Sequence, residues 1–194
     1  FPSLAGYIGF LRAGSVPLLV SNTIDHQLLK NIVETYQPAY LYIPTELAIS
    51  FQKYKTVFEH EDYVLIKNNI QSIYSLHDDL ALLLSTSGST GSPKYVRQSY
   101  RNIESNTGSI ARYLEISEED RAITTMPMNY TFGLSIINTH LSKGASIILT
   151  ESSVVNKKFW EVLKENNATN LGGVPYIFEI LKKLRFNKME LPSI

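Results

Sequence analysis

The stretch LLLSTSGSTGSPKY, residues 82–95, joins an uninterrupted aliphatic run to a segment rich in glycine, serine and threonine. The aliphatic run begins at Leu80, directly after two aspartates, and is apolar at every position through Leu84. A strand that is apolar on both faces is typical of the middle of a sheet covered by helices. The sequence therefore predicts a buried strand over 80–84, with the hydroxyl-rich segment at its carboxyl end.

The segment from Ser85 to Lys94 has the composition of an anion-binding loop. Gly88 and Gly91 allow backbone N–H groups to turn toward one anion, and Lys94 adds a full positive charge. In open α/β sheets, ligands bind beyond the carboxyl ends of the strands. We therefore expect this segment to bind phosphate oxygens. A flexible linker is the alternative interpretation, but the segment is short and continues directly from the buried strand.

The commonest phosphate loop has a different spacing. It requires a glycine, four residues, and then an adjacent glycine and lysine followed by a hydroxyl residue. Here Ser92 and Pro93 separate Gly91 from Lys94, and Tyr95 follows. A P-loop kinase or motor ATPase is therefore disfavoured.

Helix-like and strand-like segments alternate along the rest of the chain. Helices are expected over 3–13, 25–36, 102–114, 132–142, 157–166 and 175–185. Strands are expected over 16–20, 39–43, 63–66, 70–74, 80–84, 95–99, 122–126, 145–150 and 169–172. Strands separated by helices predict an α/β fold with a largely parallel sheet flanked by helices.

Individual residues mark the ends and inner faces of these helices. Asp25 is a candidate cap for the second helix, Gly144 a helix end, and Pro175 a helix start. The apolar spacing predicts two inward faces, made by Leu28, Leu29, Ile32 and Val33 in the second helix and by Ile103, Ile110, Ala111 and Leu114 in the third.

Composition excludes several classes of protein. The chain has 194 residues, 44% of them hydrophobic, enough to bury a core. Eighteen basic and eighteen acidic residues cancel, without a basic run, so we expect no nucleic acid partner. There is no cysteine, and the four histidines lack ligand spacing, so no metal site is predicted. The apolar stretch from Leu4 to Val20 is interrupted by Arg12 and Pro17, which argues against a transmembrane segment.

The segment LALLLSTSGSTGSPKYVRQSYRNI, residues 80–103, resembles the signature of the AMP-forming acyl-adenylate enzymes, which include acyl-CoA synthetases, adenylation domains and luciferase. TSGSTGSPK, residues 86–94, is the most specific part. Further segments fall in the family's order along nearly the whole chain: GFLRAGSVPLLV (9–20), MPMNYTFGLS (126–135), LSKGASIIL (141–149) and ATNLGGVPYIFEIL (168–181).

This resemblance implies an ATP-dependent ligase. In this family a carboxylate attacks the α-phosphate of Mg-ATP, giving an acyl-adenylate and pyrophosphate, and a thiol such as CoA or a carrier protein then takes the acyl group. Lys94 would be the catalytic residue, with Tyr130, Phe132 and Gly133 beside the acyl group. The β- and γ-phosphates would be held by Thr86, Ser87, Gly88, Ser89, Thr90, Gly91 and Lys94.

Three tyrosines depart from the family pattern. Family members usually have glycine where Tyr95 stands, and many have histidine at the positions of Tyr100 and Tyr130. A tyrosine carries no charge at neutral pH, so any electrostatic role of the histidine at position 130 is in doubt.

The resemblance covers only the first part of the family's large N-terminal domain. We expect 1–79 to form a first α/β portion and 80–194 the phosphate segment with a following α/β portion. The adenine-binding segments and the carboxyl-terminal domain would lie beyond Ile194, so we expect this chain alone to be inactive. We expect the parent enzyme to be cytoplasmic. Two alternatives remain: a non-catalytic binding module with a degenerate phosphate segment, and a small kinase, which would form ADP.

Overall fold

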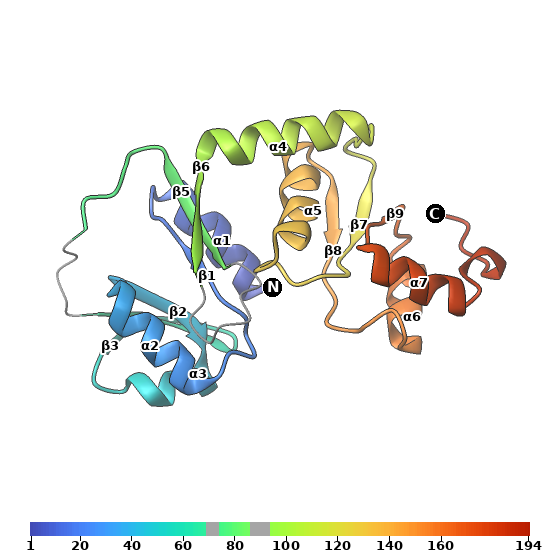
Figure 1. The fold of residues 1–194 in the computed structure, drawn as a ribbon. Coiled ribbons are helices and arrows are strands. Elements are labelled where there is room, and N and C mark those ends of the chain that lie inside the picture. The colour runs from blue at the N-terminus through green and yellow to red at the C-terminus, as the bar shows by residue number, and fades with distance from the viewer. Residues whose placement is uncertain (69–73, 86–93) are drawn as a thin grey trace. The chain divides into compact units, whose positions relative to one another are not determined.

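The computed structural model describes residues 1–68, 74–85 and 94–194 (Figure 1). The chain divides into two compact units, Phe1–Gln98 and Ser99–Ile194. The elements of the first unit are α1 (Pro2–Arg12), β1 (Leu18–Leu19), α2 (His26–Tyr36), β2 (Tyr40–Pro44), α3 (Thr45–Ala48), the 3-10 turn η1 (Ile49–Phe51), β3 (Lys55–His60), β4 (Tyr63–Lys67), β5 (Leu80–Ser85) and β6 (Tyr95–Ser99).

The second unit begins with a long helix. Its elements are α4 (Tyr100–Tyr113), β7 (Arg121–Ile123), α5 (Thr131–Ser142), β8 (Ser146–Ile148), α6 (Lys157–Glu165), β9 (Asn170–Leu171), α7 (Pro175–Lys183) and the 3-10 turn η2 (Phe186–Lys188). The predicted alternation of helices and strands is confirmed in this unit, and Pro175 begins α7 as expected.

The predicted buried strand is confirmed as β5. It lies between β1 and β6 in a three-stranded sheet, and its pairing with β1 is parallel. Ala81 and Leu82 are completely withdrawn from solvent, and Leu84 is buried. Ala81 and Leu82 point to opposite faces of the strand, so both faces are covered, which explains why the sequence is apolar at consecutive positions.

The second sheet of the first unit is antiparallel, in the order β2-β4-β3. Neither β3 nor α3 is predicted by the sequence. All six residues of β3 are exposed, so the strand has no buried face and no clear apolar alternation. Its turn into β4 uses Glu61 at φ 52°, without the glycine or asparagine that usually marks a hairpin. The expected strand over 70–74 lies, apart from Tyr74, outside the described residues.

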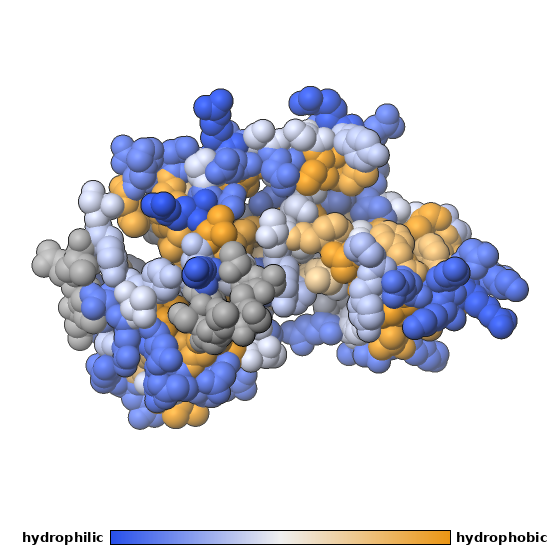
Figure 2. All heavy atoms as spheres, in the orientation of Figure 1, coloured by the Kyte–Doolittle hydropathy of each residue, from blue (hydrophilic) through white to orange (hydrophobic). Residues whose placement is uncertain are grey.

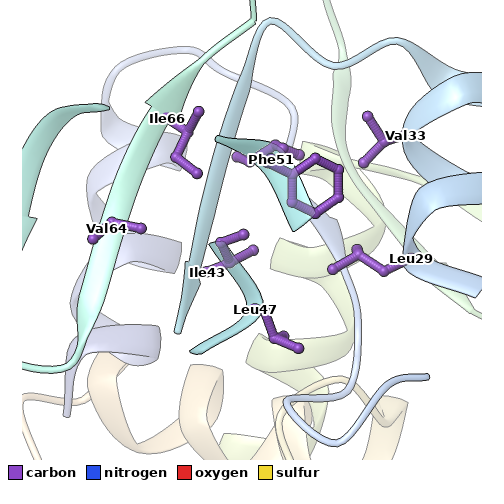
Figure 3. Packing of buried hydrophobic residues seen from close by; sticks show 8 residues of the cluster. Leu29, Val33, Ile43, Leu47, Phe51, Val64 and Ile66 are labelled. Atoms are coloured by element: carbon purple, nitrogen blue, oxygen red, sulfur yellow. The ribbon is translucent and has the colours of Figure 1, made fainter. Parts of the chain in front are cut away.

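A compact hydrophobic cluster joins α2 to this antiparallel sheet (Figure 3). The Asp25 carboxylate accepts hydrogen bonds from the backbone N–H groups of Gln27 and Leu28, which confirms the predicted helix cap. Leu28 is only half-buried, in contrast to the rest of its predicted face. The buried members of the cluster are Leu29, Val33, Leu41, Ile43, Leu47, Phe51, Val64 and Ile66.

The sheet of the second unit has the order β8-β7-β9, and both of its strand pairings are parallel. Gly144 follows the C-cap residue of α5, Lys143, and has φ +71°, so the helix ends there as predicted. A second cluster, with Phe159 and Leu163 fully buried, holds α6 and α7 to the sheet.

α4 begins two residues earlier than expected. Ser99 and Asn102 form a reciprocal capping box, in which each side chain bonds to the backbone N–H of the other residue. Leu114 was predicted to face inward, but it is 58% exposed. It follows the last helical residue, and the chain then turns at Glu115 with φ 53°, so helical spacing no longer applies. Ile116 is buried instead.

The surface is mixed in character. Hydrophilic residues cover much of the face drawn in Figure 2, and hydrophobic residues show in smaller areas between them. Within the described part of the chain, no helix combines the length and the apolar character that crossing a membrane requires.

Candidate functional site

The predicted phosphate segment connects two neighbouring strands of the first sheet. β5 ends at Ser85, and β6, which lies beside it, begins at Tyr95. Lys94 immediately precedes β6, and its side chain is exposed. The other six predicted phosphate ligands lie outside the described residues: Thr86, Ser87, Gly88, Ser89, Thr90 and Gly91. The two described residues that flank this segment are Ser85, which has a hydroxyl group, and Lys94, which has a positive charge. Both groups are suitable partners for phosphate oxygens.

Tyr95 is a packing residue at the start of β6. Its ring meets the ring of Tyr36, the last residue of α2, edge-on, with 5.3 Å between centroids and 82° between planes. Burial, with a smaller contribution from Tyr36, raises the pKa of Tyr95 to about 12. The tyrosine that departs from the family pattern is therefore neutral and fixed against a helix.

Two threonines tie together the carboxyl ends of the parallel strands in the second unit. The Thr125 hydroxyl donates to the carbonyl oxygen of Gly172 at 2.6 Å, just beyond β9. The Thr124 hydroxyl accepts from the backbone N–H of Thr150 at 3.0 Å, just beyond β8. The sequence predicted a strand through residue 126, but β7 ends at Ile123, and these side chains continue the connections between strands. The consecutive threonines Thr124 and Thr125 are the feature of the sequence that could have indicated these connections at the carboxyl ends of the strands.

Tyr130 and Phe132 lie at the same edge, at the amino end of α5. Tyr130 is the residue before the helix and is 50% exposed, while Phe132 is 37% exposed. A Cβ atom on Gly172 would stand 3.6 Å from the Phe132 ring, so the aromatic side chain lies against the glycine turn after β9. The structure thus brings two of the predicted acyl-site residues to the edge where α/β sheets bind ligands.

Gly133 has a different environment. It is buried, and a Cβ atom there would collide with the backbone carbonyl oxygens of Pro127 and Met126. The glycine therefore allows α5 to approach the preceding turn closely. Its predicted contact with substrate stays a prediction.

A polar network lies at the opposite, amino-terminal ends of these strands. The Asp120 carboxylate accepts from the Ser117 backbone N–H at 2.8 Å, the Thr169 hydroxyl at 2.9 Å and the Asn170 amide at 3.1 Å. The hydrogen bond from the Ser117 backbone is the main reason why the pKa of Asp120 is lowered. Asn170 also contacts Nε2 of the buried His140 at 3.1 Å. The sequence did not predict this network, because Asp120 lies about fifty positions from Thr169 and Asn170 along the chain.

No three histidine, aspartate or glutamate side chains gather into a possible metal site in the described ranges. Magnesium that accompanies ATP is held mainly by phosphate oxygens, water and one or two carboxylates, so the predicted cofactor pair does not require such a cluster.

Two curated proteins are similar in sequence to part of this chain. An oxalate–CoA ligase from Arabidopsis thaliana is 32% identical over 106 residues, which is 54% of this chain and 21% of that protein. A D-alanine–D-alanyl carrier protein ligase from Staphylococcus aureus is 25% identical over 156 residues, which is 79% of this chain and 32% of that protein. The chain thus spans less than a third of the length of either relative.

Solved structures share the fold. The apo MatB structure from Rhodopseudomonas palustris matches with a TM-score of 0.71 and 22% identity, over 94% of this chain and 38% of that one. The o-succinylbenzoate CoA synthetase MenE from Bacillus subtilis, solved with its acyl-adenylate intermediate, matches with a TM-score of 0.69 and 19% identity, over 94% of this chain and 48% of that one. At these identities the matches establish the fold, including the predicted α/β architecture.

The family itself follows from the sequence as a whole. The model of the AMP-binding enzymes matches residues 3–193, which include the predicted phosphate segment and both strand edges described above. The chain belongs to the AMP-binding enzyme family.

Proposed function

We propose that the full-length protein containing this chain is an ATP-dependent, AMP-forming ligase. It activates a carboxylic acid as an acyl-adenylate and transfers the acyl group to a thiol, either CoA or a carrier protein. Membership of the AMP-binding family carries this proposal. Two relatives named as ligases, one for CoA and one for a carrier protein, support the reaction type.

Lys94 is the proposed catalytic residue. When bound, ATP supplies the adenylyl group and a pyrophosphate leaving group. The difficulty of the step is the negative charge on those phosphates, which a lysine and convergent donors stabilise most when the charge is greatest. Lys94 has an exposed side chain at the start of β6, which supports this role. Its proposed partners are Thr86, Ser87, Gly88, Ser89, Thr90 and Gly91, and Mg²⁺ would enter with the nucleotide.

Tyr130, Phe132 and Gly133 are the proposed residues of the acyl site. The exposed aromatic side chains at the amino end of α5 offer an apolar surface for the acyl chain, next to the turn at Gly172. A tyrosine at position 130 can donate or accept a hydrogen bond, but it cannot supply the positive charge of a protonated histidine.

Pyrophosphate exchange tests the reaction in the full-length protein. Labelled pyrophosphate should enter ATP when a suitable carboxylate is present, with oxalate, D-alanine, o-succinylbenzoate and medium-chain fatty acids as the first panel. Replacing Lys94 with Ala should lower the exchange rate by about 100-fold. Lys164, an exposed lysine on α6, provides the control, because Lys164→Ala should leave the rate unchanged.

The products separate the alternatives. AMP and pyrophosphate support the ligase, whereas ADP would indicate a kinase. Nucleotide binding without exchange under any carboxylate would indicate a non-catalytic binding module. We also propose that residues 1–194 alone are inactive and that the enzyme is cytoplasmic. ATP turnover by the 194-residue chain would contradict the first statement, and cell fractionation tests the second.

A further inference from the structure

Most side chains at the amino end of β6 are exposed. Among the strands that the structure describes, β6 pairs with β5 at the outside of their sheet. Lys94 is exposed, and so are Val96 and Arg97. Tyr95, between them, is half-buried. Besides the pairing of β6 with β5, the packing of the Tyr95 ring therefore helps to hold the backbone next to Lys94.

That side chain is fixed by a second aromatic residue. Tyr95 meets Tyr36 edge-on at 5.3 Å, a geometry that contributes attraction beyond the burial of the two rings. Tyr36 is the last residue of α2, whose inner face is buried in the hydrophobic cluster of the first unit. The pair thus connects the backbone beside Lys94 to a helix with a packed core.

We infer that Tyr95 is a positioning residue, which acts with Tyr36 to hold Lys94 where it can bind the terminal phosphates of ATP. This inference rests on the proposed function of Lys94. The pair provides a rigid attachment at the carboxyl end of the phosphate segment. A lysine amine on a long flexible stem is effective only when its backbone is fixed, because otherwise binding must also order the strand.

The inference predicts a selective defect, which general destabilisation would not produce. AMP lacks the β- and γ-phosphates, so a misplaced Lys94 should weaken the binding of Mg-ATP and leave the binding of AMP unchanged. Isothermal titration calorimetry of the full-length protein gives both dissociation constants without knowledge of the carboxylate substrate.

Four variants make the test. Tyr95→Ala and Tyr36→Leu break the pair from either side, and each should raise the dissociation constant of Mg-ATP about threefold to tenfold, with no change for AMP. Tyr95→Phe keeps the ring and should bind as the unmodified protein does. Tyr113→Ala is the matched control, since Tyr113 is 85% exposed on α4. If one pair-breaking variant does not fold, the other still decides the outcome.

Lys94→Ala distinguishes the proposed phosphate binding by Lys94 from the proposed positioning role of Tyr95 and Tyr36. If Lys94→Ala leaves Mg-ATP binding unchanged, the proposed role of Lys94 is wrong. If Lys94→Ala weakens Mg-ATP binding but the folded Tyr95→Ala or Tyr36→Leu variants do not, the positioning role is wrong while the proposed function stands. An equal loss of ATP and AMP binding in the pair-breaking variants would also overturn the positioning role.

Discussion

Thr125 and Gly172 are joined by a hydrogen bond of 2.6 Å, from the threonine hydroxyl to the glycine carbonyl oxygen. Thr125 follows β7, and Gly172 follows β9, so the bond closes the edge of the sheet beside Phe132. This contact fixes the turn that supports the proposed acyl site.

Replacing Thr125 with Val should destabilise the protein. The shape of the side chain is kept, but the Gly172 carbonyl oxygen loses this donor in a partly buried position, at a cost of about 1–3 kcal/mol. Chemical denaturation of the full-length protein measures the change. Thr125→Ser retains the hydroxyl and should lose much less, so equal losses in the two variants would contradict the role of the hydrogen bond.

Replacing two helical glycines with Ala should change the stability of the protein in opposite directions. Gly133→Ala should destabilise the protein by about 1–3 kcal/mol, because the added methyl group would collide with backbone carbonyl oxygens that cannot move aside easily. Gly108→Ala, within α4, should instead stabilise it by about 0.4–1 kcal/mol, because the added carbon meets no described atom within 4 Å beyond the adjacent residues and backbone of its own helix. Thermal unfolding compares them, and a stable Gly133→Ala variant would show that the turn before α5 is not closely packed.

Asp120 should make stability depend on acidity. Its pKa is lowered in the folded state, so its contribution is present above the ordinary aspartate value of about 3.9 and is lost as pH falls through the lower folded value. Asp120→Asn should therefore cost about 1–3 kcal/mol at neutral pH, because an amide cannot accept from all three donors, and the difference should shrink in acid. Unfolding curves at several pH values test this, with the exposed Glu119→Gln as control. A pH-independent difference would be inconsistent with the carboxylate's role.

Tyr95 should weaken the fold in strong alkali. Its pKa is about 12 in the folded protein, against an ordinary value of 10.0. The stabilisation is therefore fully present below about pH 10 and is lost as pH rises toward about 12, since the unfolded chain ionises first. Tyr95→Phe should remove this part of the alkaline loss, as measured by unfolding between these two pH values. An unchanged alkaline profile in Tyr95→Phe would show that Tyr95 does not titrate in this range.

The features predicted from the sequence are those set by local chemistry. The buried strand β5 follows from five consecutive apolar residues, and the start of α2 follows from Asp25. β3 was missed because its exposed residues carry no burial pattern. The inward orientation of Leu114 was wrong because the helix ends before it.

The candidate site shows a similar division. The resemblance predicts Lys94, Tyr130 and Phe132 as site residues, since each lies in a recognisable motif. It did not predict the contacts between distant segments that lie next to these residues. Tyr36 is fifty-nine positions from Tyr95 along the chain, and Thr125 is likewise distant from Gly172. Such contacts depend on how strands and helices pack, which local sequence does not specify.

A crystal structure of the full-length protein with Mg-ATP shows where the triphosphate binds. We expect the β- and γ-phosphates to lie within hydrogen-bonding distance of the Lys94 amine and of the segment from Thr86 to Gly91. A triphosphate bound elsewhere, with Lys94 directed into solvent, would contradict this expectation.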